Sequence, residues 1–173
     1  MAVETDRIIS QGPASPQEGE IERALRPATL ADADALVHHR LAMFADMGVP
    51  FERSGLEAAF RAWLAHTMPA GVYRAWLVET GAGEVAAGGG ITVIAWPPGP
   101  HYPGDRLAFV YNMYTEPAHR HRGLARQVMD AIHTWCRGNG VTSLALNASR
   151  DGRRLYAALG YVESSAPMMF LAL

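Results

Sequence analysis

A chain of 173 residues suits one domain with a sizeable core, and an apolar content of 49% excludes an intrinsically disordered protein. The formal net charge of -2 argues against a general nucleic-acid coat and against a binder of anionic membranes. All fifteen residues of the Lys and Arg class are Arg, and the absence of Lys excludes both a Walker-type phosphate loop and Schiff-base catalysis by lysine.

No apolar run is long enough to span a bilayer, so no membrane partner is expected. The first residues, MAVETDRIIS, lack the basic and apolar regions of a signal peptide. The only cysteine, Cys136, cannot form an internal disulfide, which favours a reducing, cytoplasmic location.

Residues 1–20 are polar and contain Gly and Pro, which predicts a flexible N-terminal arm ahead of one domain over residues 21–173. IERALRP predicts a first strand that stops at Pro27. Thr29 is expected to cap a helix, and Ser54 to cap a second one.

The middle of the chain alternates between strands and turns. YRAWLVE and EVAAGGGITVIAW predict a hairpin that turns at TGAG. RLAFVYNMYT is an almost continuous apolar and aromatic run, typical of a buried central strand.

Beyond Gly123, apolar residues at helical spacing predict a helix that ends at GNG. TSLALNAS predicts a strand, DGRRLYAALG a short helix and APMMFLAL a last strand. The predicted order is βααββ followed by βαβαβ, which indicates an α/β or α+β architecture around one sheet.

Positive charge gathers in EPAHRHRGLARQVM, where a loop becomes a helix. The first backbone N–H groups of a helix have no partner within it, and the helix dipole is positive there. A phosphate group is therefore the expected ligand, approached closely by Gly123 and contacted by the neighbouring arginines. The alternatives are a solvated helix terminus with incidental arginines and a His119–His121 metal pair, although the pair has no evident third ligand and we expect no metal.

The motif Arg120-His121-Arg122-Gly123-Leu124-Ala125 resembles the Arg/Gln-x-x-Gly-x-Gly/Ala signature of the GCN5-related N-acetyltransferase (GNAT) superfamily. RRLYAALGY, some thirty residues later, resembles the family's Leu-Tyr-x-x-x-Gly-Phe/Tyr motif. The resemblance implies a single-domain GNAT fold over residues 21–173, with a mixed, mostly antiparallel sheet flanked by helices. The strands of residues 106–115 and 142–149 are then splayed to hold acetyl-CoA.

The resemblance also implies the residues that contact acetyl-CoA. Its pyrophosphate would lie on the loop and helix start, and the rest of the cofactor would follow the preceding strand. The implied contacts are Met113, Tyr114, Thr115, His121, Arg122, Gly123, Leu124, Ala125, Arg126 and Ser149. Ser149 stands where the family often has Asn.

Amine attack on a thioester creates an oxyanion and releases a thiolate, so the site needs an oxyanion donor and a proton source. The resemblance implies that the backbone N–H of Met113 is the donor and that Tyr156 is the general acid. From the residues alone, both side chains fit ordinary core positions.

The sequence leaves the acceptor side open. Its wall is expected to include Phe44, Met47, Trp96 and Tyr111, each of which also fits an ordinary core. Many relatives carry a glutamate base in the strand before the loop, but LAFVYNM contains no carboxylate. Glu116 is expected to turn towards the phosphate loop, and Asp46 and His101 to be surface residues, so no base is assigned.

The expected function is therefore transfer of an acetyl group from acetyl-CoA to a primary amine of a small molecule, by direct attack in a ternary complex. The open alternatives are a peptide or protein amine as acceptor, or a non-catalytic acyl-CoA-binding sensor. An RNA-binding module finds no support in the overall charge, so no nucleic-acid partner is expected. The resemblance makes a homodimer possible.

Overall fold

The computed structural model describes residues 23–100, 102–165, 168–169 and 171 of the chain. The predicted arm of residues 1–20 lies outside these residues. The strands are β1 (Arg23–Pro27), β2 (Tyr73–Thr80), β3 (Val85–Ala95), β4 (Arg106–Thr115) and β5 (Ser143–Leu146). The helices are η1 (Leu30–Asp32), α1 (Ala33–Asp46), α2 (Arg53–Thr67), η2 (Pro117–His119), α3 (Leu124–Gly138) and α4 (Arg153–Ala158).

The five strands form one sheet in the order β1-β2-β3-β4-β5. Neighbours pair antiparallel from β1 to β4, whereas β4 and β5 pair parallel. The parallel pairing runs only from Leu107↔Ser143 to Val110↔Leu146, while β4 continues to Thr115. The predicted mixed, mostly antiparallel sheet is therefore confirmed, and β5 pairs with β4 up to its own end at Leu146.

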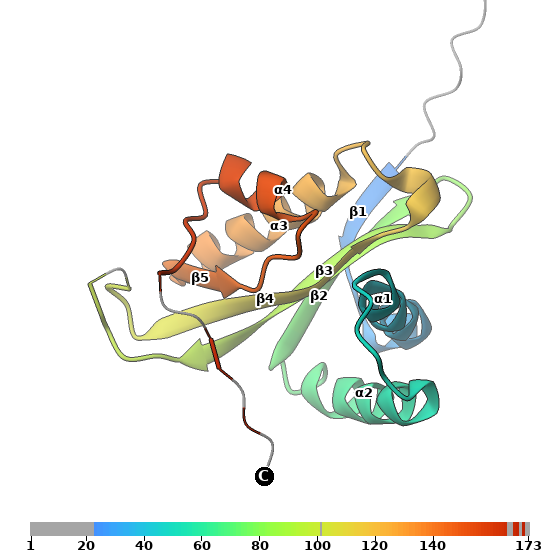
Figure 1. Ribbon diagram of the computed structural model, residues 1–173, viewed down its shortest axis with the longest axis horizontal. Coiled ribbons are helices and arrows are strands. Elements are labelled where there is room, and N and C mark those ends of the chain that lie inside the picture. Colours follow the sequence, from blue (N-terminus) through green and yellow to red (C-terminus); the bar gives the residue numbers. More distant parts are fainter. Residues whose placement is uncertain (1–22, 101, 166–167, 170, 172–173) are drawn as a thin grey trace, which may run out of the picture.

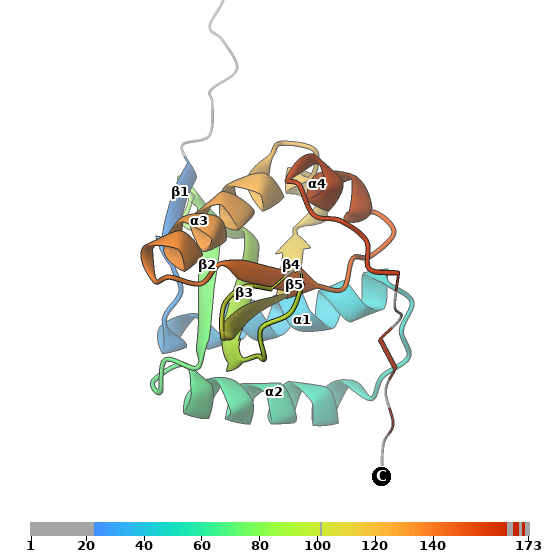
Figure 2. The ribbon, with the colours of Figure 1, turned by 90° about the vertical axis from the view of Figure 1, so that its left-hand side faces the viewer.

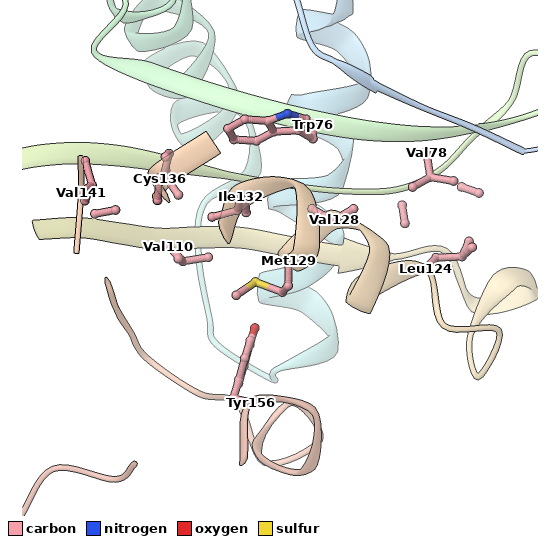
Figure 3. Close-up of a cluster of buried hydrophobic side chains, with 14 residues drawn as sticks. Trp76, Val78, Val110, Leu124, Val128, Met129, Ile132, Cys136, Val141 and Tyr156 are labelled. Atoms are coloured by element: carbon pink, nitrogen blue, oxygen red, sulfur yellow. The ribbon is translucent and has the colours of Figure 1, made fainter. Parts of the chain in front are cut away.

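Helices cover both faces of the sheet: α3 and α4 lie on one side, and α1 and α2 on the other (Figures 1 and 2). Strand β2 shows why, because its buried side chains alternate between two separate cores. Trp76 and Val78 join the α3 core, which Figure 3 shows, while Tyr73, Ala75 and Leu77 join the core beneath α1 and α2. A strand that is apolar on both faces needs cover on both.

Two sequence expectations about the ends of elements need correction. Glu52, not Ser54, is the cap of α2: its carboxylate accepts from the backbone N–H groups of Ser54 and Gly55 at 2.8 and 2.5 Å. An acidic side chain also suits the positive end of the helix dipole. The described residues of the predicted last strand, 168–169 and 171, are not in a strand, and its other residues lie outside the described part.

Strand β4 carries a bulge opposite a triplet of glycines in β3. The register passes from Gly88↔Tyr114 to Gly90↔Tyr111, so Asn112 and Met113 share one partner position at Gly89. Asn112 has a φ of 58°, a left-handed conformation that Asn tolerates better than most residues. A Cβ at Gly89 would collide with the Met113 sulfur of the bulge, and one at Gly90 with the Tyr73 hydroxyl and the Arg74 carbonyl of β2, so both positions favour glycine.

Candidate functional site

The loop between β4 and α3 has the backbone shape of an anion-binding turn. His121 and Gly123 both have left-handed φ values, 61° and 78°. A Cβ at Gly123 would meet no other atom within 4 Å, so the loop is open on that side. The first backbone hydrogen bond at the start of α3 is donated by the Gln127 N–H to the Gly123 carbonyl, at 3.1 Å. The preceding N–H groups are thus left to bind a ligand.

The three arginines of the loop have different roles. Arg120 is held by the protein itself: its Nε donates to the Thr115 carbonyl at 3.0 Å, and its guanidinium pairs with Asp46 and lies over the Tyr114 ring. Arg122 and Arg126 are exposed, and the described residues provide no ion pair for either. The charge that remains for a phosphate therefore comes from Arg122 and Arg126.

Tyr156 extends from α4 towards α3, with its hydroxyl end directed to Met129 (Figure 3). The ring is buried, and Tyr161 packs edge-on against it with centroids 5.8 Å apart. Burial raises the pKa of the Tyr156 phenol, which keeps the hydroxyl protonated near neutral pH. No hydrogen bond of this hydroxyl is formed among the described residues.

Ser149 lies in the turn before α4, and its Oγ accepts from the Gly152 N–H at 3.1 Å. Gly152 is held close to the tyrosine, because a Cβ there would meet the Tyr156 ring at 2.8 Å and the Ser149 Oγ at 3.2 Å. The hydroxyl proton of Ser149 is still free to be donated to a ligand.

Met113 stands in the β4 bulge, three residues beyond the last pair between β4 and β5. Its side chain packs against the core beneath α3, whereas Tyr111 packs against the core beneath α1 and α2. Asn112 also faces α1 and α2, since it contacts Arg40 and Tyr73. The bulge thus places two consecutive side chains on one face and leaves the Met113 backbone outside the regular ladder with β3.

Glu116 was expected to turn towards the phosphate loop, but it turns towards α1 instead. Its carboxylate contacts two adjacent imidazoles of α1, at 2.8 Å from His38 Nε2 and 3.4 Å from His39 Nε2. His38 is exposed, while His39 is buried beside Tyr114. Burial and then the neighbouring His38 lower the pKa of His39 to about 4, and an interaction with the Val85 backbone offsets only part of this.

Arg40 lies beside the β4 bulge, and it is not among the residues expected from the sequence. It lies on α1, and its Nη1 donates to the Asn112 Oδ1 at 2.5 Å. Its guanidinium lies over the rings of Phe44 and Phe60, 5.0 and 4.6 Å from their centroids. The available signal was an arginine among the apolar positions of an amphipathic helix, but its partner Asn112 is 72 residues away in the sequence.

Two residues of the expected acceptor wall, Phe44 and Tyr111, lie near Arg40. The Arg40 guanidinium lies over the Phe44 ring. Tyr111 stacks on Tyr73, whose hydroxyl accepts a hydrogen bond from Asn112, the residue that Arg40 contacts. Met47 and Trp96 are instead exposed on the surface. Asp46 forms an ion pair with Arg120, and His101 lies outside the described residues.

The described part of the chain contains no group of three or more His, Cys, Asp or Glu that is arranged to hold a metal ion. His119 contacts Glu84 at 3.4 Å and is buried, whereas His121 is exposed. None of the helices in the described ranges has the length and hydropathy needed to cross a bilayer.

Comparison with known proteins places this geometry in a family. Residues 36–161 match the model of the acetyltransferase (GNAT) family. A GCN5-related N-acetyltransferase from Ralstonia eutropha JMP134 is 30% identical over 87% of this chain and 99% of its own, with a TM-score of 0.78. A comparison with curated proteins finds no match.

Two further structures share the fold at lower identity. A predicted acetyltransferase from Clostridium acetobutylicum, solved with acetyl-CoA, is 22% identical over 87% of this chain and 96% of its own, with a TM-score of 0.79. Aminoglycoside N-acetyltransferase AAC(6')-Iy in complex with CoA is 15% identical over 91% and 99%, with a TM-score of 0.72. The family match covers most of the chain and includes both motifs, so the chain belongs to the GNAT family of acetyltransferases.

Proposed function

We propose that the chain transfers an acetyl group from acetyl-CoA to a primary amine of a small molecule, by direct attack in a ternary complex. The observation that carries this proposal is the end of β5 at Leu146, opposite Val110, which leaves the last five residues of β4 unpaired with β5 ahead of the open loop at Gly123. We place the extended pantetheine arm along residues 111–115 of β4, which have no strand partner on the β5 side among the described residues.

The residues present fit this ligand. Open space at Gly123, the unused N–H groups of the α3 start and the unpaired Arg122 and Arg126 suit a pyrophosphate. In the proposal, His121 to Arg126 hold the pyrophosphate, while Met113, Tyr114 and Thr115 follow the pantetheine. Ser149 donates its hydroxyl to the same arm.

Acetyl-CoA supplies an activated acyl group as a thioester. The protein holds the acceptor amine against this carbonyl, so that a C–N bond forms while negative charge develops on the oxygen. The Met113 N–H is proposed to donate to that oxygen. Tyr156 then gives its proton to the departing sulfur as the C–S bond breaks, and the proton lost by the amine returns to the phenol through solvent.

Small amines are the proposed acceptors because of the neighbours of this fold. An aminoglycoside N-acetyltransferase and glucosamine-6-phosphate N-acetyltransferase from Arabidopsis thaliana are among them, the latter with 14% identity and a TM-score of 0.66. These identities support the fold only, so the amine itself must be identified by experiment.

The test is release of free thiol from acetyl-CoA across a panel of amino acids, polyamines, aminoglycosides and peptides. We expect turnover of at least one small amine, with intersecting initial-velocity lines when both substrates are varied. Parallel lines would contradict direct attack. Binding of acetyl-CoA without turnover of any amine would instead favour the sensor function.

A further inference from the structure

The proposed function requires an acceptor amine, and on that basis Arg40 bears on the chemistry of the acceptor. Arg40 lies on α1 and contacts the β4 bulge on the face covered by α1 and α2. A guanidinium carries a fixed positive charge and five N–H donors. Among the described residues, one of these donors has an acceptor, the Asn112 Oδ1.

The remaining donors of Arg40 are poorly satisfied. Its Nε is buried and has no hydrogen-bond partner in the part of the chain that the structure describes. No carboxylate of the described residues forms an ion pair with it, although Arg26, Arg61 and Arg120 each have one. Desolvation of a cation without a paired anion is costly, so such a group is a candidate for ligand recognition.

The other described neighbours of Arg40 are uncharged. Phe44 and Phe60 lie against the guanidinium, and the titratable groups that act on its pKa are the phenols of Tyr73 and Tyr111, which burial keeps protonated and therefore neutral. Burial lowers the pKa of Arg40, but an arginine remains charged at any physiological pH. The site therefore offers one positive charge among aromatic side chains.

The position of Arg40 relates it to the reacting atoms. Asn112, its hydrogen-bond partner, directly precedes Met113, whose N–H is the proposed oxyanion donor. Because the bulge turns Asn112 and Tyr111 to the same face, Arg40 lies on the side of β4 opposite the core that packs against α3. A ligand bound at Arg40 would therefore lie beside the same bulge that carries the proposed oxyanion donor.

We propose that Arg40 binds a carboxylate of the acceptor, so that the substrate is an amino acid or another amine that carries a carboxylate. A planar carboxylate can accept from two guanidinium N–H groups at once. A single cation matches a single negative charge, whereas a phosphate dianion would leave charge uncompensated among the described neighbours. The apolar rings around the guanidinium exclude water and strengthen the pair.

The experiment compares α-, β- and γ-amino acids with their primary amides and with aminoalkylphosphonates of the same lengths. Thiol release gives kcat/KM for the wild type and for Arg40→Met, which keeps the length of the side chain and removes its charge. The matched control is Arg61→Met, because Arg61 is paired with Asp34 and Glu57 on the surface of α2.

We expect the wild type and Arg61→Met to prefer at least one acid over its amide by about ten- to a hundredfold, the range for a hydrogen-bonded charge pair. Arg40→Met should reduce this preference to about one while the amide changes little. Arg40→Lys should restore part of the preference, since it keeps the charge but not the planar fork. An unchanged preference in Arg40→Met, an equal loss for acid and amide, or a preference for the phosphonate would overturn the assignment.

A binding measurement separates this inference from the proposed function. Titration of the CoA-saturated protein with N-acetylated acids and N-acetylated amides reports the carboxylate site without turnover. Binding of the acids that is lost in Arg40→Met supports the site even if no amine is acetylated. Turnover of neutral amines without any preference for acids refutes the site and leaves the acetyltransferase intact. Equal binding of acid and amide to the wild type also refutes it.

Discussion

At the scale of single residues, the most direct prediction concerns the Tyr156 hydroxyl. Tyr156→Phe should keep the buried ring and the fold, because the hydroxyl forms no hydrogen bond among the described residues. Loss of a general acid typically costs about a hundred- to ten-thousandfold in rate, and less where water substitutes. We expect kcat to fall while the affinity for acetyl-CoA stays constant, since the effect belongs to the transition state.

The measurement is kcat and cofactor affinity together, with circular dichroism as a check on folding. Tyr161→Phe is the matched control, because it removes a hydroxyl bonded to His133 at 2.9 Å from the same small core. An unchanged kcat in Tyr156→Phe, with chemistry shown to limit the rate, would return Tyr156 to a purely structural role.

Cys136 gives a second prediction at this scale. The side chain is fully buried on the inner face of α3, and burial raises the pKa of its thiol to about 11. Because the thiolate is the reactive form, labelling of the native protein should be slow and should become fast on unfolding. Rapid labelling of the folded protein, or loss of turnover in a folded Cys136→Ala variant, would be evidence that the thiol takes part in the reaction.

At the scale of elements, the turn into α3 is the part that a glycine substitution tests best. Gly123→Asp would place a carboxylate in the open space where the pyrophosphate is proposed to lie. Losing two charge-assisted hydrogen bonds of about 1.5 kcal/mol or more each predicts a loss of acetyl-CoA affinity of about a hundredfold. Isothermal titration calorimetry measures this loss directly.

Gly83→Asp is the control for backbone strain. Gly83 has a φ of 79°, close to the 78° of Gly123, and a Cβ there also meets no atom within 4 Å. It lies in the turn between β2 and β3, outside the proposed site. Equal losses of acetyl-CoA affinity in the two variants would show that backbone strain causes the loss, and not repulsion of the pyrophosphate.

The elements also show what sequence reasoning can and cannot predict. The strands, the hairpin and the loop before α3 follow from local patterns, since periodicity, glycine and charge are all read within a short window. The β4 bulge does not, because it depends on Asn112, Met113 and the glycines of β3 fitting together across two strands. The orientation of Glu116 likewise depends on His38 and His39, which are more than seventy residues earlier in the chain.

At the scale of the whole molecule, the sheet separates two sides that are built from different parts of the sequence. The proposed cofactor side is built by consecutive elements, β4, α3, β5 and α4, so its residues form recognisable motifs. The side that carries Arg40 joins α1 and α2 to the middle of β4 through contacts such as Arg40 with Asn112. Such distant pairs leave no spacing to recognise, which is why the acceptor side could not be predicted.

Histidine burial between α1 and the sheet predicts how the stability of the molecule changes with pH. The Nδ1 of His39 is buried and forms no hydrogen bond within the described ranges, so protonation there would add a charge and an unsatisfied donor. The native pKa is about 4, against 6.5 for an exposed histidine. Below pH 6.5 the unfolded chain binds a proton that the native protein does not, so stability falls as the pH drops towards 4.

The size of this effect follows from the two pKa values. Between pH 7 and pH 5 the histidine should remove about 2 kcal/mol from the free energy of unfolding, at about 1.4 kcal/mol for each unit of pKa shift. Urea unfolding of the wild type and of His39→Leu, at both pH values, isolates this contribution. His133, whose pKa burial also lowers, remains in both proteins and cancels in the difference. The opposite result is a wild-type protein that loses no more stability on acidification than His39→Leu does. It would show that Glu116 compensates the charge of a protonated His39, so that the pair of His39 and Glu116 holds a proton in the native state.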